Sequence, residues 1–208
     1  MRRASGTRDE TETRMAHVEP DVADYVKQIA MIKADASSLV GGLSPEAFNW
    51  QPPPGKWSAG QCLEHLNITY HAMLPRMQEA AARTRASGRR AGGAMRHGFF
   101  MRWFIADMEP PPKRRYVTGR GFAPPSILSR EQVLGEFVRL HDGLLLLLEE
   151  LNGYDLGAVR VPSPFAGWMR YKLGSGIALT LAHDRRHLWQ AREAVEAFSE
   201  GGHKRREG

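Results

Sequence analysis

The chain has 208 residues, of which 42% are hydrophobic, and a formal net charge of +6 at pH 7. This length and apolar content are enough for one well-buried core, so a single domain is the default expectation. The only cysteine, Cys62, excludes an internal disulfide framework, and no stretch approaches the roughly 18 to 20 apolar residues of a membrane-spanning helix. The sequence therefore favours a protein of the reducing cytoplasm with no membrane partner.

The two ends of the chain differ from its middle. Residues 1–20 contain arginines but no apolar segment behind them, so they are expected to be a disordered leader rather than a secretory signal. Met15 directly precedes the first patterned segment, which leaves open whether Met1 or Met15 is the true start. Residues 199–208 are expected to be a disordered basic tail. One domain is predicted between them, over residues 21–198.

The first helix is predicted over residues 21–40. Its apolar residues recur at steps of three and four, which is typical of a helix in a bundle: Val22, Tyr25, Ile29, Ile32, Ala36, Leu39 and Leu43. Pro20 suits the first helical position, and Gly41 provides a stop. A short capped turn is expected at Ser44. Residues 50–57 contain three prolines and cannot form regular structure.

A capping box of Ser58 and Gln61 opens the second predicted helix, which runs to about Arg85. The inward stripe of this helix consists of Cys62, His65 or Leu66, Thr69, Met73 and Met77. His65 is therefore predicted to face inward, whereas His71 is rotated by about 120° from it. A lone inward histidine is more often a hydrogen-bonded core residue than a ligand.

The segment 76–130 is strongly basic, with twelve lysines or arginines against three acidic residues, a local charge of +9. A flexible loop is expected over 86–98 and a short helix over 99–108, followed by an irregular proline-rich stretch. The segment is either a solvated elaboration or the rim of a site for an anionic substrate, with Arg114 and Arg115 as candidate anion-binding residues. No nucleic-acid motif accompanies it, so no nucleic-acid partner is expected.

Ser129 and Gln132 form the second capping box and open a third predicted helix, which ends at Asn152. Leucines over 144–148 make its second half apolar nearly all round. Two explanations remain open, a homodimer interface and burial under the proline-rich stretch. His141 lies beside the inward stripe, either as an ordinary hydrogen-bonded residue or as a residue that orients a metal ligand.

The fourth helix, predicted from about Met169 to Phe198, carries His183, His187 and Gln190 at i, i+4 and i+7. Residues four apart on a helix are about 5 to 6 Å apart at Cβ, so two imidazoles there can reach one metal ion. Chance alone gives roughly 0.3 such histidine pairs in this chain, so a third ligand is required. His65 is the candidate, and Gln190 is expected to orient an imidazole or a bound water.

These four amphipathic helices, with no segment of strand periodicity and no internal repeat, predict an all-α four-helix bundle. The basic, proline-rich segment becomes an insertion between the second and third helices. Facing helices in such a bundle place His65 opposite His183 and His187.

Five short motifs occur along the chain in a characteristic order. They are L-S-P-E through P-P-G-K-W-S at 43–58, E-H-L at 64–66, G-F-A-P-P-S at 121–126, P-S-P-F-x-G at 162–167 and H-D-R-R-H-L-W-Q at 183–190. In this order they resemble the DinB-like superfamily of metal-dependent enzymes. The resemblance implies a four-helix bundle in which His65, His183 and His187 bind a divalent metal ion. The basic residues around 83–96 depart from the compact core of that family.

Three neutral imidazoles leave at least one coordination position open, as catalytic metal sites do, and they suit zinc, nickel and iron. The resemblance favours a transferase in which a low-molecular-weight bacterial thiol attacks a small electrophilic substrate. A hydrolase that uses metal-bound hydroxide, and a non-catalytic protein that binds a metal or small ligand, remain alternatives. A zincin-type protease is disfavoured because Asp184, rather than a glutamate, follows the first histidine.

Overall fold

The computed structural model describes residues 18–53 and 55–204, so most of the predicted leader and residues 205–208 lie outside the described part. The elements in chain order are α2 (Pro20–Val40), α3 (Pro45–Asn49), α4 (Ala59–Ala86), α5 (Phe99–Met108), the 3-10 helix η1 (Arg120–Phe122), α6 (Arg130–Glu150), β1 (Arg160–Pro162), β2 (Arg170–Lys172) and α7 (Leu173–Lys204). The described chain is thus mostly helical, as the sequence predicts.

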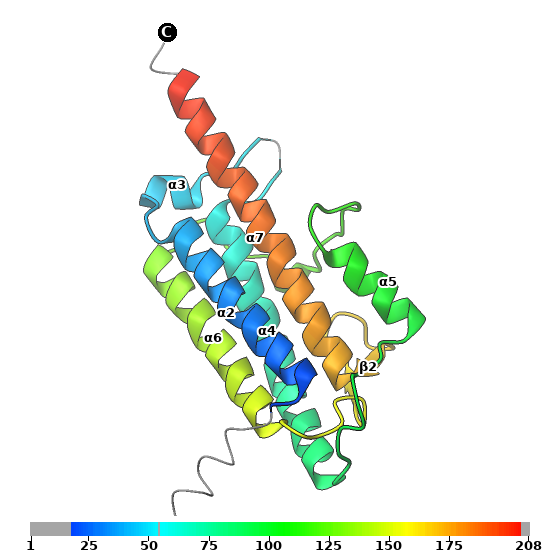
Figure 1. Ribbon diagram of the computed structural model, residues 1–208. Coiled ribbons are helices and arrows are strands. Elements are labelled where there is room, and N and C mark those ends of the chain that lie inside the picture. Colours follow the sequence, from blue (N-terminus) through cyan, green and yellow to red (C-terminus); the bar gives the residue numbers. More distant parts are fainter. Residues whose placement is uncertain (1–17, 54, 205–208) are drawn as a thin grey trace, which may run out of the picture.

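The four longest helices lie side by side (Figure 1). Helix α4 packs against both α6 and α7, and α2 packs against the same two helices. Helix α5 lies outside this group and packs against α7. Among the described helices, none is long and apolar enough to cross a membrane.

Serine side chains begin three of the helices. Ser44 Oγ accepts a hydrogen bond from Ala47 N, so the predicted capped turn is the short helix α3. Ser58 and Gln61 form the predicted capping box at α4 in both directions. At α6 the amide of Gln132 donates to Ser129 Oγ at 3.4 Å, which is one half of the predicted capping box. Each cap satisfies amide groups that have no partner within the helix.

The expectation that no segment forms a strand was wrong. Residues 160–162 and 170–172 pair as two antiparallel strands, with Val161 opposite Tyr171. Both of these side chains are buried and both have more exposed neighbours. The alternation of a strand extends over only three residues on each side, which is too short to register as a period. Helix α7 consequently begins at Leu173 rather than at Met169.

The far end of α7 also differs from the expectation. The helix continues to Lys204, so part of the tail that was expected to be disordered is helical. Most of the leucine-rich half of α6 is explained by packing, because α6 contacts both α2 and α4. Leu144, Leu147 and Leu148 are buried there, whereas Leu146 is 61% exposed. The proposed homodimer remains a prediction.

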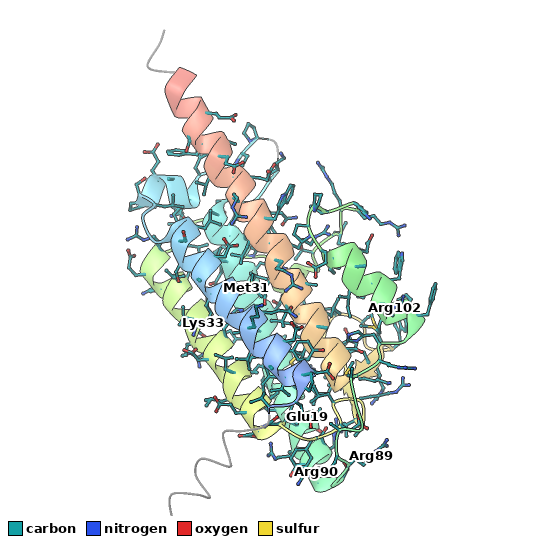
Figure 2. The ribbon with its side chains drawn as sticks, in the orientation of Figure 1. Glu19, Met31, Lys33, Arg89, Arg90 and Arg102 are labelled. Carbon is teal, nitrogen blue, oxygen red and sulfur yellow. The ribbon has the colours of Figure 1, made fainter. Side chains whose placement is uncertain are left out.

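The basic loop after α4 is held in place at several points. The amide of Ala91 donates to the carbonyl of Gly153, and the amide of Met95 donates to the Asp21 carboxylate at 2.6 Å. Arg90 lies over the ring of Tyr154. The loop is therefore hydrogen-bonded to the start of α2 and to the turn after α6, although it was expected to be flexible. Two of its arginines, Arg89 and Arg90, lie at the end of the molecule where α2 starts (Figure 2).

The contact between α3 and α4 predicts a sharp sensitivity at one glycine. A Cβ at Gly60 would lie 2.6 Å from Cε1 of Phe48, whose side chain is fully buried. Gly60→Ala should therefore lower the free energy of unfolding by about 1–3 kcal/mol, measured by urea denaturation. Gly135→Ala is the matched control, because a Cβ there meets nothing within 4 Å. It should be neutral or stabilise α6 by up to about 1 kcal/mol, and equal effects of the two changes would contradict this account.

Candidate metal centre

Three histidines from two helices converge in the structure. His65 comes from the second turn of α4, whereas His183 and His187 lie one turn apart on α7. The Nε2 atom of His183 is 3.4 Å from Nε2 of His65 and 3.1 Å from Nε2 of His187. One ring nitrogen from each residue lies within 4.8 Å of those of the other two. The packing of α4 against α7 thus brings together residues that are more than a hundred positions apart in the sequence.

The carbonyl of Phe122, in η1, sets the tautomer of His65. The Phe122 oxygen lies 2.8 Å from Nδ1 of His65, and a carbonyl can only accept a hydrogen bond. In the neutral ring, Nδ1 therefore carries the proton, and Nε2 presents its lone pair to the other two histidines. Metal-binding histidines are usually oriented by a hydrogen bond of this kind. Phe122 belongs to the segment that the sequence placed in the insertion, and no local pattern predicts this contact.

Burial keeps the three imidazoles neutral. It lowers the pKa of His65, lowers the pKa of His183 to about 3, and lowers the pKa of His187 well below its ordinary value. Each pKa falls because the protonated ring would lose its hydration, and the neighbouring cluster members add repulsion for His183 and His187. Neutral imidazole is the form that binds metal ions.

The donor set fits a divalent metal ion. Two nitrogen ligands that each lie about 2.0–2.1 Å from a tetrahedral zinc ion are roughly 3.3 Å from one another. The measured separations of 3.1 and 3.4 Å lie on either side of this value. Among the described residues no carboxylate joins the three histidines in this group, and neutral imidazoles also suit nickel or iron. The geometry is therefore compatible with one metal ion held by His65, His183 and His187.

Trp57 forms one wall of the cluster, and the sequence analysis did not single it out. Its ring stacks on His187 with a centroid separation of 5.7 Å and lies 4.8 Å from the ring of His65. The ring of Phe122, in η1, lies against the ring of Phe165, with 4.7 Å between the ring centroids. The linker 50–57 thus has a second role besides joining α3 to α4. A tryptophan directly before the capping serine was the available signal.

Gln190 lies one turn beyond His187. The Gln190 side chain raises the pKa of His187 and so opposes part of the decrease that burial causes. Even so, the buried Nδ1 atom of His187 has no hydrogen bond of ordinary geometry within the described residues. The orienting role expected for Gln190 stays a prediction.

His141 belongs to a buried group beside the cluster. Its Nε2 atom lies 3.2 Å from the Asp184 carboxylate, and its Nδ1 atom lies 2.7 Å from the carbonyl of Phe137. The Tyr70 hydroxyl donates to the same carboxylate oxygen at 2.8 Å. Asp184 directly follows His183, so His141 acts on the backbone of α7 through Asp184 rather than on the ring of a clustered histidine.

The remaining candidates lie further from the cluster. The exposed side chain of Arg114 lies over the ring of Trp103 and 3.8 Å from the Asp107 carboxylate. Arg115 is exposed, with no ion pair among the described residues. Arg186, next to His187, was missed by the sequence analysis. Its buried guanidinium donates to the backbone carbonyls of Asp107 and Arg114.

Cys62 and His71 are excluded from the cluster by their surroundings. The Cys62 thiol is fully buried in the core, and burial raises its pKa to about 12. It is therefore an uncharged packing residue at neutral pH. His71 forms an ion-pair contact of 2.8 Å with Glu136, and more than half of its side chain is exposed. The rotation of about 120° expected from the sequence thus directs it away from His65.

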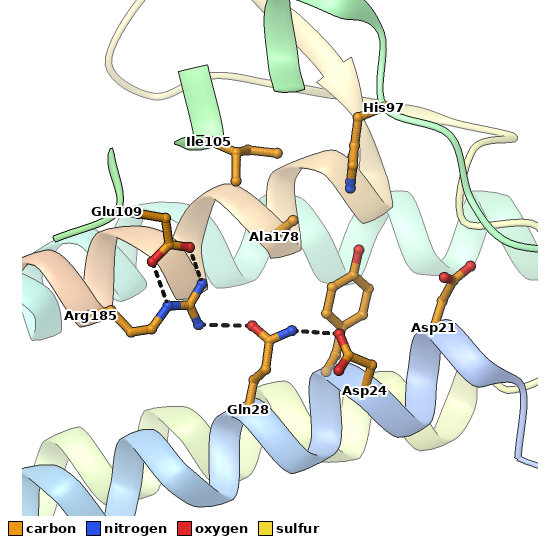
Figure 3. A pocket seen from close by; sticks show the side chains of 9 residues that line it. Asp21, Asp24, Gln28, His97, Ile105, Glu109, Ala178 and Arg185 are labelled. Atoms are coloured by element: carbon orange, nitrogen blue, oxygen red, sulfur yellow. Dashed lines mark hydrogen bonds and ion pairs between the residues drawn. The ribbon is translucent and has the colours of Figure 1, made fainter. Parts of the chain in front are cut away.

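A cavity of about 250 Å³ lies on another face of α7, between α2 and α5. Figure 3 shows a polar chain along it, in which Arg185 binds Glu109 through two hydrogen bonds and also donates to Gln28, which donates to Asp24. None of the three clustered histidines lines this cavity. Its polar chain fastens the end of α5 to α7 and α2.

Comparison with known families finds one match. The sequence profile of the DinB superfamily matches residues 28–191, which is more than half of the chain. Neither the curated proteins nor the solved structures yield a match.

The buried histidines predict how stability depends on pH in the metal-free protein. Because their pKa values are lowered in the folded state, the unfolded chain binds more protons as the pH falls below about 6.5. The free energy of unfolding should then decrease towards pH 3, by up to about 1.4 kcal/mol per pH unit for each histidine. Urea titrations at several pH values measure this slope. His183→Gln should flatten it while the exposed control His71→Gln should not; equal slopes in all three proteins would contradict the assignment.

Proposed function

The chain belongs to the DinB superfamily, and from this membership and the cluster of three histidines we propose that it is a metal-dependent enzyme. The observation that carries the proposal is the convergence of three imidazole nitrogens from α4 and α7. In this proposal α2, α4, α6 and α7 form a four-helix bundle. The residues between α4 and α6 form its basic, proline-rich insertion.

His65, His183 and His187 would bind one divalent metal ion, with zinc, nickel and iron as candidates. When bound, such an ion acts as a Lewis acid and lowers the pKa of a thiol or water beside it. The chain's own residues prepare this site. Phe122 holds the His65 ring, Trp57 covers two of the imidazoles, and burial keeps all three rings neutral.

The surroundings of the cluster favour a thiol as the nucleophile. Asp184 is fully buried, and its Oδ2 atom is bound by Tyr70 and His141, so it is not placed to take a proton from water. A thiol ionises more readily than water and needs less help from a neighbouring base. Cys62 is buried and has a pKa of about 12, so the thiol would be supplied from outside. A thiol-dependent transferase that acts on a small electrophilic molecule is the function we propose.

The positive charge of the insertion supports an anionic thiol or substrate. The exposed side chains of Arg114 and Arg115 would hold its carboxylate or phosphate by charge-assisted hydrogen bonds. Arg186 connects their segment to the cluster, because it donates to the carbonyl of Arg114 and directly precedes His187. The segment is thus attached next to the histidines.

A hydrolase is the second candidate. It is favoured by the donor set itself, because three neutral histidines also support hydrolytic and hydration chemistry on zinc. A requirement for added thiol separates the two reactions. A non-catalytic metal-binding protein would show neither activity.

The first test is metal binding. Protein purified without a histidine tag should bind one equivalent of divalent metal, measured by elemental analysis after dialysis. His187→Ala should weaken binding by more than 100-fold, since two imidazoles chelate poorly, whereas Gln190→Ala should weaken it by about 10- to 100-fold. His71→Ala is the matched control and should retain the metal. Full metal content in both His65→Ala and His187→Ala proteins would refute the site.

The second test is the thiol requirement. The metal-loaded protein should convert electrophilic substrates only when a low-molecular-weight thiol is added, as followed by loss of free thiol and by mass spectrometry of the product. Cys62→Ala should keep this activity, because the buried thiol does not take part, and His183→Ala should lose it. Metal-dependent ester or amide hydrolysis without thiol would instead establish the hydrolase.

A further inference from the structure

Helix α5 presents one side to the protein and another to solvent. It lies beside α7, outside the group of four long helices (Figure 1). Ile105 lines the cavity between α2, α5 and α7, Met101 packs against the core, and Met108 is buried. The opposite side carries Phe99, which is 87% exposed, and Phe100, which is 53% exposed.

The exposed rings form a connected surface. Phe100 lies 6.1 Å from Trp103 and 6.0 Å from Phe104, measured between ring centroids. Phe104 in turn lies 6.3 Å from Tyr116, which is followed by the fully exposed Val117. A contiguous apolar surface of this kind on a short helix marks an interaction site more often than a solvated face.

Exposed cations occur on α5 and in the chain on either side of it. Arg102 is exposed on α5 itself (Figure 2), and Arg96, Lys113 and Arg115 are near it in the sequence. None of these four has an ion pair among the described residues, as the nearby acids are already engaged: Glu109 with Arg185, and Asp107 with Arg114 and Tyr116. Helix α5 and its flanking residues therefore carry exposed positive charges that have no ion pair among the described residues.

The face is also held in a fixed orientation. Arg185 on α7 binds Glu109, the residue directly after α5, through two hydrogen bonds and continues to Gln28 on α2 (Figure 3). Arg186 donates to the backbone carbonyls of Asp107 and Arg114 on the same segment. These contacts keep the inner side of α5 on α7, so the aromatic rings stay exposed.

We propose that this aromatic-basic face, formed by Phe99, Phe100, Arg102, Trp103, Tyr116 and Val117, docks on the surface of an anionic lipid membrane. Phenylalanine and tryptophan side chains on one side of a helix enter the headgroup region, and nearby arginines and lysines attract anionic lipids. No segment crosses the bilayer in such a contact.

Two other binding partners, a nucleic acid and a second copy of the chain, fit the aromatic-basic face less well. Bases of a nucleic acid stack on free aromatic faces along a charged groove, whereas the rings of Phe100, Trp103 and Phe104 lie against one another. A second copy of the chain would bring two uncompensated positive surfaces together. An anionic lipid surface matches both the exposed apolar rings and the charge.

Vesicle flotation tests the proposal with the full-length protein. The protein should float with vesicles of phosphatidylglycerol and phosphatidylcholine, at least about tenfold more strongly than with pure phosphatidylcholine, and high salt should reduce the difference. Phe99→Ser combined with Phe100→Ser should weaken binding by about tenfold or more. Arg102→Glu should weaken it by about fivefold or more.

Two exposed residues on α2 provide matched controls. Met31→Ser removes an apolar side chain that is 63% exposed, and Lys27→Glu reverses an exposed charge. Both variants should bind vesicles like the unchanged protein. Absence of vesicle binding, or equal losses in the α5 and α2 variants, would overturn the proposal.

The same variants distinguish the other occupants. Salt-sensitive binding to nucleic acid without vesicle binding would assign the face to nucleic acid. A dimer in sedimentation analysis that dissociates in the Phe99→Ser and Phe100→Ser protein would assign it to self-association. Either result would overturn docking on lipid. Metal content reports the integrity of the histidine cluster in every variant, so failure of this proposal leaves the proposed enzyme function untouched.

Discussion

The buried carboxylate of Asp184 connects three helices of the structure. A carboxylate without exposure to water is costly unless it is hydrogen-bonded. It reaches Tyr70 on α4 and His141 on α6 only when α7 has one particular rotation about its axis. The residue before Asp184 is His183, so the same rotation directs the histidine face of α7 towards His65. The polar group in the core therefore determines where the imidazoles point.

Helical periodicity made most of the fold predictable. The steps of three and four along α2, α4 and α6 coincide with buried residues, because one face of each helix packs on its neighbours. The i, i+4 spacing of His183 and His187 likewise required only local helix geometry. The choice of His65 over His71 followed from rotation about one helix axis, and the structure places these two residues on different faces.

Contacts between distant segments could not be predicted in this way. Trp57 and Phe122 reach the cluster from a linker and from a 3-10 turn, and neither position belongs to a periodic pattern. The strand pair at 160–162 and 170–172 is too short to show alternation. The net charge showed that the segment between α4 and α6 is basic. It did not show that Glu109 pairs with Arg185 or that Asp107 accepts a hydrogen bond from Tyr116. A net charge summed over a segment does not show which charged side chains form ion pairs with residues elsewhere in the chain.

The segment between α4 and α6 has two sides with different contacts. Its inner contacts, made by Arg185 and Arg186, attach it to the helix that carries two of the clustered histidines. Its outer face keeps aromatic rings and unpaired cations in solvent, although burying those rings would be favourable. The contacts of the inner side with α7 thus fix the orientation in which the aromatic rings are exposed.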